Sequence, residues 1–177
     1  WRKGYHFSIR AFAKVAARFP ELHYVIVGKR YGDAYYERLQ NLIAELGLGS
    51  RVHILERVDT RAELIRLYKN AELFCLFSQN VGHDVEGFGL VFLEAAAAGL
   101  PVVGPKNCGV DDAAQDGVNG ILVPGRSPDD FADAIITILS DTAKKKAMSE
   151  ASRAFAREMT WERQIARYTD LWRCLIS

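Results

Sequence analysis

Short apolar runs alternate with segments of helical periodicity along this chain, and this alternation constrains the fold more than any other feature. The predicted strands cover residues 22–27, 52–55, 73–77, 101–103 and 120–123. None of them alternates apolar with polar side chains, which is typical of strands buried in a parallel sheet. Helices that connect parallel strands cover the faces of the sheet, so the sequence predicts a doubly wound α/β domain.

The helices between these strands are predicted from apolar spacing and from signals at their ends. Pro20 ends the first helix, and Gly47 and Gly99 follow the second and fourth. Thr60 with Glu63 has the pattern of a capping box. Helices are expected at residues 5–19, 33–46, 60–68, 89–98 and 128–139, with a helical turn at 110–115 and two further helices opening at residues 142 and 160.

The composition excludes several classes of protein. The 177 residues fit one domain, and a formal net charge of +1 lacks the strongly basic character of nucleic-acid-binding proteins. The three cysteines have no Cys-x-x-Cys spacing, so neither a disulfide framework nor a zinc site is indicated. No apolar run reaches membrane-spanning length and no signal peptide is present, so a cytoplasmic location is expected.

Two features of the C-terminal third leave alternatives open. Basic residues gather at 144–146 and from 153 to 167, which indicates a solvated helix face or, alternatively, a patch that contacts a membrane surface. The last helix also has an apolar stripe, which packs either on its own domain or against a domain outside this sequence. The stripe consists of Ile165, Tyr168, Leu171, Trp172 and Leu175.

A glycine-rich turn between two glutamates marks the candidate site. Gly87 and Gly89 open the helix at 89–98, and Glu86 and Glu94 flank this turn with seven residues between them. Backbone N–H groups at a helix N-terminus bind anions, and carboxylates beside them can accept hydrogen bonds from hydroxyl groups. A phosphate next to a polyol indicates a nucleotide sugar.

A second anion-binding signal lies at the start of the chain. Lys3 and Gly4 begin the first helix, where the ammonium group and the helix dipole suit a diphosphate. Gly28 and the loops at 78–89 and 104–109 follow predicted strands, so they should line the edge of the sheet at which ligands bind. The dinucleotide and P-loop glycine patterns do not occur, which lowers the weight of a dehydrogenase or P-loop interpretation.

Five segments, taken together, resemble the retaining GT-B glycosyltransferases of family 4. They are residues 2–4, 25–28, 86–95, 99–103 and 116–124, in the family's order. The resemblance covers essentially the whole chain and implies the Rossmann-like, C-terminal, donor-binding lobe of a GT-B fold. The motif Asp84-Val85-Glu86-Gly87 is most similar to that of mannosyltransferases acting on lipid-linked or phosphatidylinositol acceptors.

The resemblance implies a role for each matching residue. Lys3 would hold the donor diphosphate, Glu86 would contact the donor sugar, and Glu94 would bind the ribose hydroxyls. The other residues implied at the donor are Gly28, Lys29, Arg57, Val58, Asp59, Gly87, Phe88, Gly89 and Leu90. No metal or further cofactor is expected, because Lys3 and a helix N-terminus can stabilise the leaving diphosphate.

One segment departs from the family pattern. The family often has Gly-Gly-x-x-Glu where this chain has Cys108-Gly109-Val110-Asp111-Asp112, which leaves any role of Asp111 or Asp112 open.

The expected activity is transfer of a hexose, with mannose from GDP-mannose as the leading donor, to a saccharide or lipid-linked acceptor in glycan or polysaccharide biosynthesis. A UDP-sugar donor and a non-catalytic nucleotide-binding module are the alternatives. The chain opens within a predicted loop, so a first strand and an acceptor-binding N-terminal domain are expected outside it. The 177 residues alone should bind nucleotide and transfer nothing. Peripheral association of the full-length protein with the inner face of the membrane stays open.

Overall fold

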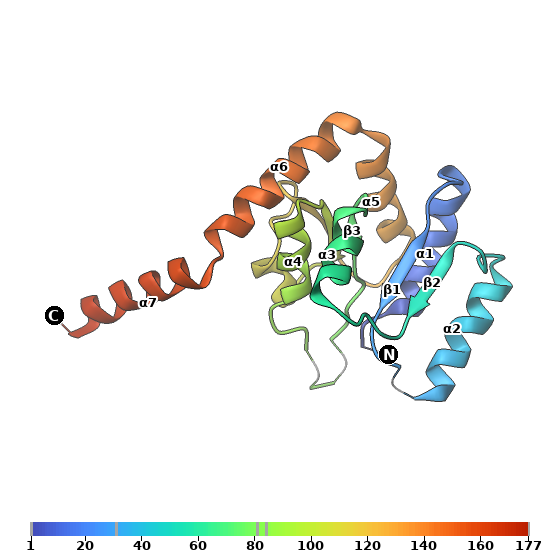
Figure 1. Cartoon of the computed structure of the whole chain (residues 1–177), viewed down its shortest axis with the longest axis horizontal. Coiled ribbons are helices and arrows are strands. Elements are labelled where there is room, and N and C mark those ends of the chain that lie inside the picture. Colours follow the sequence, from blue (N-terminus) through green and yellow to red (C-terminus); the bar gives the residue numbers. More distant parts are fainter. Residues whose placement is uncertain (1, 31, 81, 84, 177) are drawn as a thin grey trace.

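A computed structural model describes residues 2–30, 32–80, 82–83 and 85–176, and its elements follow the predicted order (Figure 1). They are α1 (Tyr5–Arg18), β1 (Tyr24–Val27), α2 (Asp33–Glu45), β2 (Val52–Leu55), α3 (Arg61–Lys69), β3 (Phe74–Cys75), α4 (Leu90–Ala98), β4 (Val102–Pro105), the 3₁₀ helix η1 (Gly109–Asp112), β5 (Gly120–Val123), α5 (Pro128–Ser140), α6 (Thr142–Glu158) and α7 (Trp161–Ile176). The prediction of an α/β fold with parallel strands is confirmed.

The strands are divided between two parallel sheets. β1 pairs with β2, with Tyr24 opposite Val52, and β4 lies between β3 and β5. Within the described residues β1 and β3 are not paired, which differs from the single predicted sheet. The N-terminal segment lies beside the end of β3 instead, because the Gln79 amide donates to the Arg2 carbonyl at 2.8 Å.

The expectation that every strand is covered on both faces fails at β1. Val25 is 41% exposed, whereas Ile26 on the opposite face is buried. β3 is also shorter than predicted, since regular strand geometry is limited to Phe74–Cys75 although the Leu76 amide still donates to the Val103 carbonyl. The apolar character of these runs therefore predicted where the strands lie in the chain, but not whether both faces of each strand are buried.

Two apolar clusters hold the elements together. The larger one joins α1, α2 and α5 to β1, and its centre is Phe77, whose ring centroid lies 4.6 Å from that of Phe131. The smaller one lies between α4 and the sheet of β3, β4 and β5, around the fully buried Phe92. Burial of a side chain of this size stabilises the folded state by about 1.5–3 kcal/mol. Both clusters end at the loops that follow the strands.

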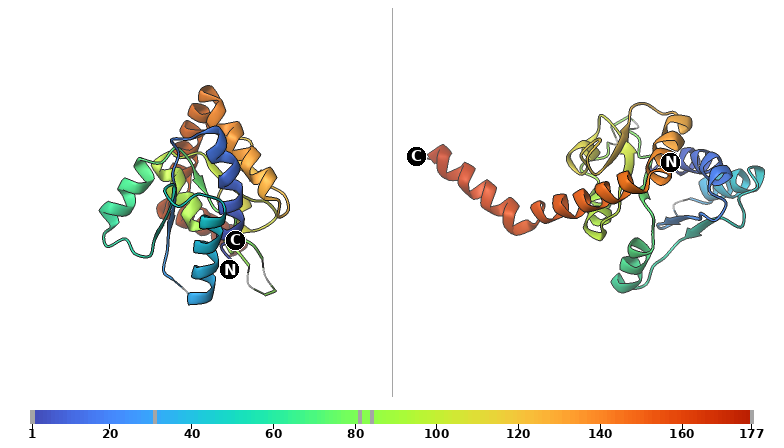
Figure 2. Two further views of the ribbon diagram at one scale, coloured as in Figure 1. Left: turned by 90° about the vertical axis from the view of Figure 1, so that its right-hand side faces the viewer. Right: turned by 90° about the horizontal axis from the view of Figure 1, so that it is seen from above.

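Helix α7 extends away from the rest of the chain, as Figure 1 and the right-hand view of Figure 2 show. None of its described residues is buried, and Trp161, Tyr168 and Leu175 are 74–79% exposed. The described residues of the apolar stripe make no buried contact with their own domain in this structure. No helix in the described part of the chain is long and apolar enough to cross a membrane.

Candidate functional site

The connections that follow β1, β2 and β3 gather at one edge of the molecule, the lower edge in Figure 1. Parallel pairing aligns the carboxyl ends of neighbouring strands, and ligands of α/β sheets bind at such ends. The Gly28 amide donates to the Leu55 carbonyl at 3.0 Å, so β1 and β2 stay paired as far as this edge. The edge carries the predicted site residues in three groups.

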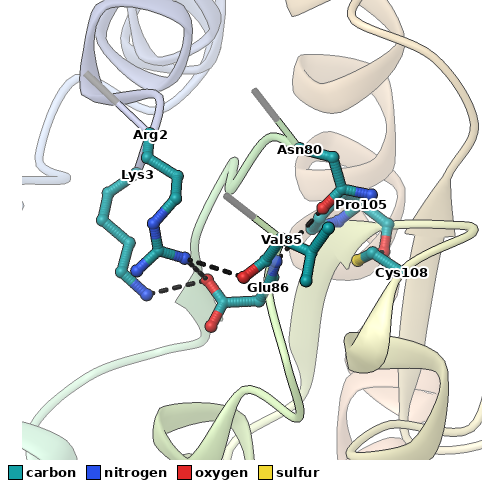
Figure 3. Close-up of polar contacts among 7 residues, drawn as sticks. All are labelled: Arg2, Lys3, Asn80, Val85, Glu86, Pro105 and Cys108. Carbon is teal, nitrogen blue, oxygen red and sulfur yellow. Dashed lines mark hydrogen bonds and ion pairs between the residues drawn. The ribbon is translucent and has the colours of Figure 1, made fainter. Parts of the chain in front are cut away.

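The first group is an ion cluster around Glu86 (Figure 3). Lys3 Nζ lies 2.7 Å and Arg2 Nη1 lies 3.3 Å from Glu86 Oε2, and both cations come from the segment before α1. The carboxyl side chain is only 9% exposed. Burial acts to raise the pKa of Glu86, but the hydrogen bond from Lys3 and the charges of Lys3 and Arg2 hold the pKa below its ordinary value. Glu86 is therefore an ionised carboxylate shared by two cations.

The backbone of Glu86 is fixed by Asn80 and Gly109, which lie in loops predicted to line this edge but were given no individual role. Its amide donates to Asn80 Oδ1 at 3.1 Å, and its carbonyl accepts from the Gly109 amide at 3.0 Å. A Cβ atom on Gly109 would lie 1.7 Å from the Gly87 carbonyl oxygen, so only glycine allows this approach. The sequence signals were the placement of both loops at this edge and the partial family match of the segment that contains Gly109. The contacts themselves had no signal in the sequence.

The N-termini of α1 and α4 lie at this edge without a side-chain cap. Gly4 precedes α1 with φ 64° and Gly89 precedes α4 with φ 79°, and neither has a side chain to occupy the first amides. A Cβ atom on Gly4 would lie 2.0 Å from the Phe77 carbonyl oxygen. Leu90, the first residue of α4, is 63% exposed. Both helix dipoles therefore present positive ends that suit an anion.

The second group lines a pocket of about 400 Å³ between the ends of β1 and β2 and the start of α3. Five residues predicted at the donor meet here, namely Gly28, Lys29, Arg57, Val58 and Asp59. Arg57 forms an ion pair with Asp59 on the rim. Val27, Glu56, Thr60, Arg61 and Leu64 complete the lining. Its volume lies in the range of pockets for small ligands.

The third group is Glu94 and its partner on the neighbouring helix. Glu94 is an exposed residue of α4, and its Oε2 atom accepts a hydrogen bond from the Tyr68 hydroxyl at 3.0 Å. Sequence spacing gave no sign of Tyr68, which lies 26 positions earlier on α3. Glu94 does not line the pocket between β1 and β2, and no contact recorded among the described residues joins it to Lys3 or Glu86.

The remaining carboxylates are placed as follows. Asp111 Oδ2 accepts from the Cys108 amide at 3.0 Å, which completes the cap of η1 and gives Asp111 a local structural role. Asp112 is exposed at the end of η1. Asp84 of the glutamate motif lies outside the described residues. Across the described ranges, no group of three or more His, Cys, Asp or Glu side chains could hold a metal ion.

The fold matches that of a known class of enzyme. The α/β arrangement with parallel sheets corresponds to the C-terminal domains of GT-B glycosyltransferases. The structure aligns with Anabaena HepE in complex with UDP and glucose at a TM-score of 0.80 and 29% identity, covering 96% of this chain and 45% of that one.

The family model described as glycosyl transferases group 1 matches residues 1–155. This chain therefore belongs to the group 1 glycosyltransferases.

Two curated relatives refine this membership. The chain is 34% identical over 173 residues to a GDP-mannose-dependent alpha-(1-6)-phosphatidylinositol monomannoside mannosyltransferase of Mycolicibacterium smegmatis, covering 96% of this chain and 44% of the relative. It is also 34% identical over 178 residues to a D-inositol 3-phosphate glycosyltransferase of Corynebacterium urealyticum, with coverage of 98% and 40%. The chain thus spans less than half the length of these relatives.

Proposed function

We propose that this chain is the donor-binding half of a retaining hexosyltransferase, with GDP-mannose as the leading donor. One observation carries the proposal. Lys3 and Arg2 converge on Glu86, the uncapped N-termini of α1 and α4 lie at the same edge, and the pocket between β1 and β2 opens at that edge too. A nucleoside diphosphate sugar needs neighbouring sites of these kinds, because the molecule joins a base, a diphosphate anion and sugar hydroxyl groups.

The ion cluster accounts for the departure of the nucleoside diphosphate. When the bond between the anomeric carbon and the phosphate oxygen breaks, its electron pair stays on the diphosphate. Lys3 and the helix N-termini supply the positive charge that stabilises this anion, so we expect no metal to be needed. A bound diphosphate would compete with Glu86 for Lys3 and Arg2.

Glu86 and the acceptor complete the reaction. The anomeric carbon gains oxocarbenium character as the diphosphate leaves, and the ionised Glu86 carboxylate would stabilise that positive charge. The acceptor oxygen forms the new bond to the anomeric carbon and gives up its proton to an oxygen of the departing diphosphate. Both a covalent intermediate and a front-face attack are consistent with one carboxylate at this position.

Glu94 and the pocket account for the nucleoside. We propose that Glu94 binds the ribose hydroxyls. Glu94 is exposed, and its carboxylate accepts a hydrogen bond from the Tyr68 hydroxyl. The base belongs in the pocket that Gly28, Lys29, Arg57, Val58 and Asp59 line. The backbone from Gly87 to Leu90 would meet phosphate or sugar hydroxyls, with Phe88 packed against the smaller apolar cluster and Gly89 holding the left-handed turn.

A UDP-sugar is the alternative donor, since HepE was solved with UDP and glucose whereas the mycobacterial relative is named as GDP-mannose-dependent. A non-catalytic nucleotide-binding module is the alternative of a different class. We propose a glycan or lipid-linked acceptor held by a domain outside these residues, in a cytoplasmic protein that contacts the membrane peripherally. The 177 residues alone would then bind nucleotide without transferring sugar.

Calorimetric titration with GDP, UDP, ADP and their sugar conjugates tests the proposal. We expect at least tenfold weaker binding in Lys3→Ala and in Glu94→Ala, since each removes a charged contact. Lys14→Ala and Glu150→Ala are matched controls on α1 and α6, because Lys14 pairs with Asp129 and Glu150 is exposed. The assignment of these residues to a donor site is wrong if no nucleoside diphosphate binds, or if neither Lys3→Ala nor Glu94→Ala weakens binding. A preference for GDP over UDP selects the leading donor.

A further inference from the structure

The hydrogen bond between Tyr68 and Glu94 joins two helices that carry different parts of the proposed donor site. The Tyr68 hydroxyl donates to Glu94 Oε2 at 3.0 Å. The Tyr68 ring is half-buried, and its centroid lies 6.1 Å from that of Phe74, which packs edge-on against the fully buried Phe92. The core therefore anchors the ring, while the hydroxyl group reaches an exposed carboxylate.

The face of α3 that carries Tyr68 also lines the base pocket. Arg61 and Leu64 line that pocket, and Tyr68 follows Leu64 by four residues. Residues separated by three and seven positions share one face of a helix. The rise of about 1.5 Å per residue places Tyr68 about 10 Å along the axis from Arg61, which is the length scale of a nucleoside. One face of α3 therefore runs from the pocket to Glu94.

We infer that Tyr68 is a positioning residue that fixes the Glu94 carboxylate for the ribose hydroxyls and so couples the base pocket on α3 to ribose binding on α4. This inference rests on the ribose role proposed for Glu94. With Oε2 held by Tyr68, the lone pairs that Oε2 does not use and the whole of Oε1 can accept from the hydroxyl pair. A carboxylate already held in one rotamer loses less conformational freedom when the nucleoside binds.

The protonation of Tyr68 supports the direction of this hydrogen bond. Burial, and then the neighbouring charge of Glu94, raise the pKa of the Tyr68 phenol above its ordinary value. The phenol therefore stays a donor at neutral pH and the carboxylate an acceptor. No residue of α3 is fully buried, so this contact ties a lightly packed helix to α4.

Calorimetry with GDP and UDP, each beside its 2′-deoxy analogue, tests the inference on the full 177-residue chain. Tyr68→Phe keeps the ring and removes only the donor. We expect it to weaken the ribonucleotide about three- to tenfold and to reduce the preference for ribose over deoxyribose by a similar factor. Inorganic pyrophosphate, which has no ribose, should bind equally to both proteins. A loss of packing alone would weaken all probes without changing the ribose preference.

Two further variants separate the outcomes. Tyr168→Phe is the matched control, because Tyr168 is 74% exposed on α7, and it should bind as the unmodified chain does. Combining Tyr68→Phe with Glu94→Gln should add little to Glu94→Gln alone, since Tyr68 acts only through the Glu94 carboxylate. Unchanged ribose preference in Tyr68→Phe, with Glu94→Gln still impaired, overturns the role of Tyr68 only. If Glu94→Gln also keeps the ribose preference, the proposed function of Glu94 fails as well.

Discussion

The residue that best shows the chemistry of this edge is Glu86. Its motif indicated a carboxylate near an anion, and the structure adds that the same oxygen contacts Lys3 and Arg2. Arg2, for which the sequence indicated no role of its own, lies beside Lys3 on the same carboxylate. Such clusters are costly to break, because a buried charge that loses its partner keeps its desolvation penalty.

The stability of the chain should therefore depend on pH through Glu86. Its folded-state pKa is lowered from 4.5, so its contribution to the free energy of unfolding is fully present above that value and is lost as the pH falls through the folded-state pKa. In Glu86→Gln, the free energy of unfolding should therefore fall less steeply as the pH is lowered. Urea unfolding at a series of pH values from 7 to 3 measures it.

Lys3→Met is the informative partner variant in that series. Since Lys3 forms the shorter ion pair with Glu86, its removal should also flatten the dependence of stability on pH, and the double variant should add little. Identical pH dependence in the unmodified chain and in Glu86→Gln would contradict this origin of the acid sensitivity.

At the scale of elements, the sequence predicted what local signals determine. The Thr60 hydroxyl accepts from the Glu63 amide, as its capping pattern indicates, but the Glu63 carboxylate accepts from the Asp59 amide, so the predicted capping box is only half formed. The Ser127 hydroxyl caps α5 by accepting from the Asp130 amide. Gly28 and residues 57–59 meet in one pocket because strand order alone places them at one edge. Tyr68 and Asn80 could not be predicted, since each acts through a contact that only the packing of α3, α4 and the loop after β3 creates.

The division of the strands between two sheets has the same cause. A run of apolar residues identifies a strand, but its neighbours depend on contacts far apart in the sequence. The Arg2 carbonyl accepts a hydrogen bond from the Gln79 amide, so the N-terminal segment lies beside the end of β3. The same contact holds Lys3 near Glu86, which relates the break between the sheets to the geometry of the site.

The close contact of Gly109, at the start of η1, with the backbone of Glu86 and Gly87 should be essential for the conformation of the loop that carries Glu86. In Gly109→Ala the added methyl group would lie 1.7 Å from the Gly87 carbonyl oxygen, so the loop or η1 has to move. We expect a loss of about 1–3 kcal/mol in the free energy of unfolding and at least tenfold weaker nucleotide binding. Chemical denaturation and calorimetry measure the two effects.

Gly49→Ala is the matched control for this substitution. A Cβ atom at Gly49 meets nothing within 4 Å, and its φ angle is not in the left-handed region. The control should change stability by no more than about 1 kcal/mol and leave nucleotide binding unchanged. Equal behaviour of the two variants would show that the loop does not depend on the close approach of Gly109.

At the scale of the whole molecule, α7 stands apart from the buried core of the domain. The residues described at the donor-site edge lie between Arg2 and Asp112, whereas α7 buries none of its described residues and carries an open apolar stripe. We propose that this stripe contacts a domain outside these residues in the full-length protein. The chain spans 40–44% of its curated relatives, so such a domain is available in proteins of this kind.

A chain that ends at Thr160 should therefore keep both fold and nucleotide binding. Removing α7 deletes exposed apolar side chains, including Trp172 at 67% and Ile176 at 71%, and no buried one among the described residues. The shortened chain should have the same midpoint of urea unfolding and the same affinity for GDP, and it should self-associate less, because exposed apolar stripes drive association. Sedimentation velocity at several concentrations measures the last effect. A fall in the unfolding midpoint would mean that α7 packs on this domain in solution, and the proposed contact with another domain would then lose its basis.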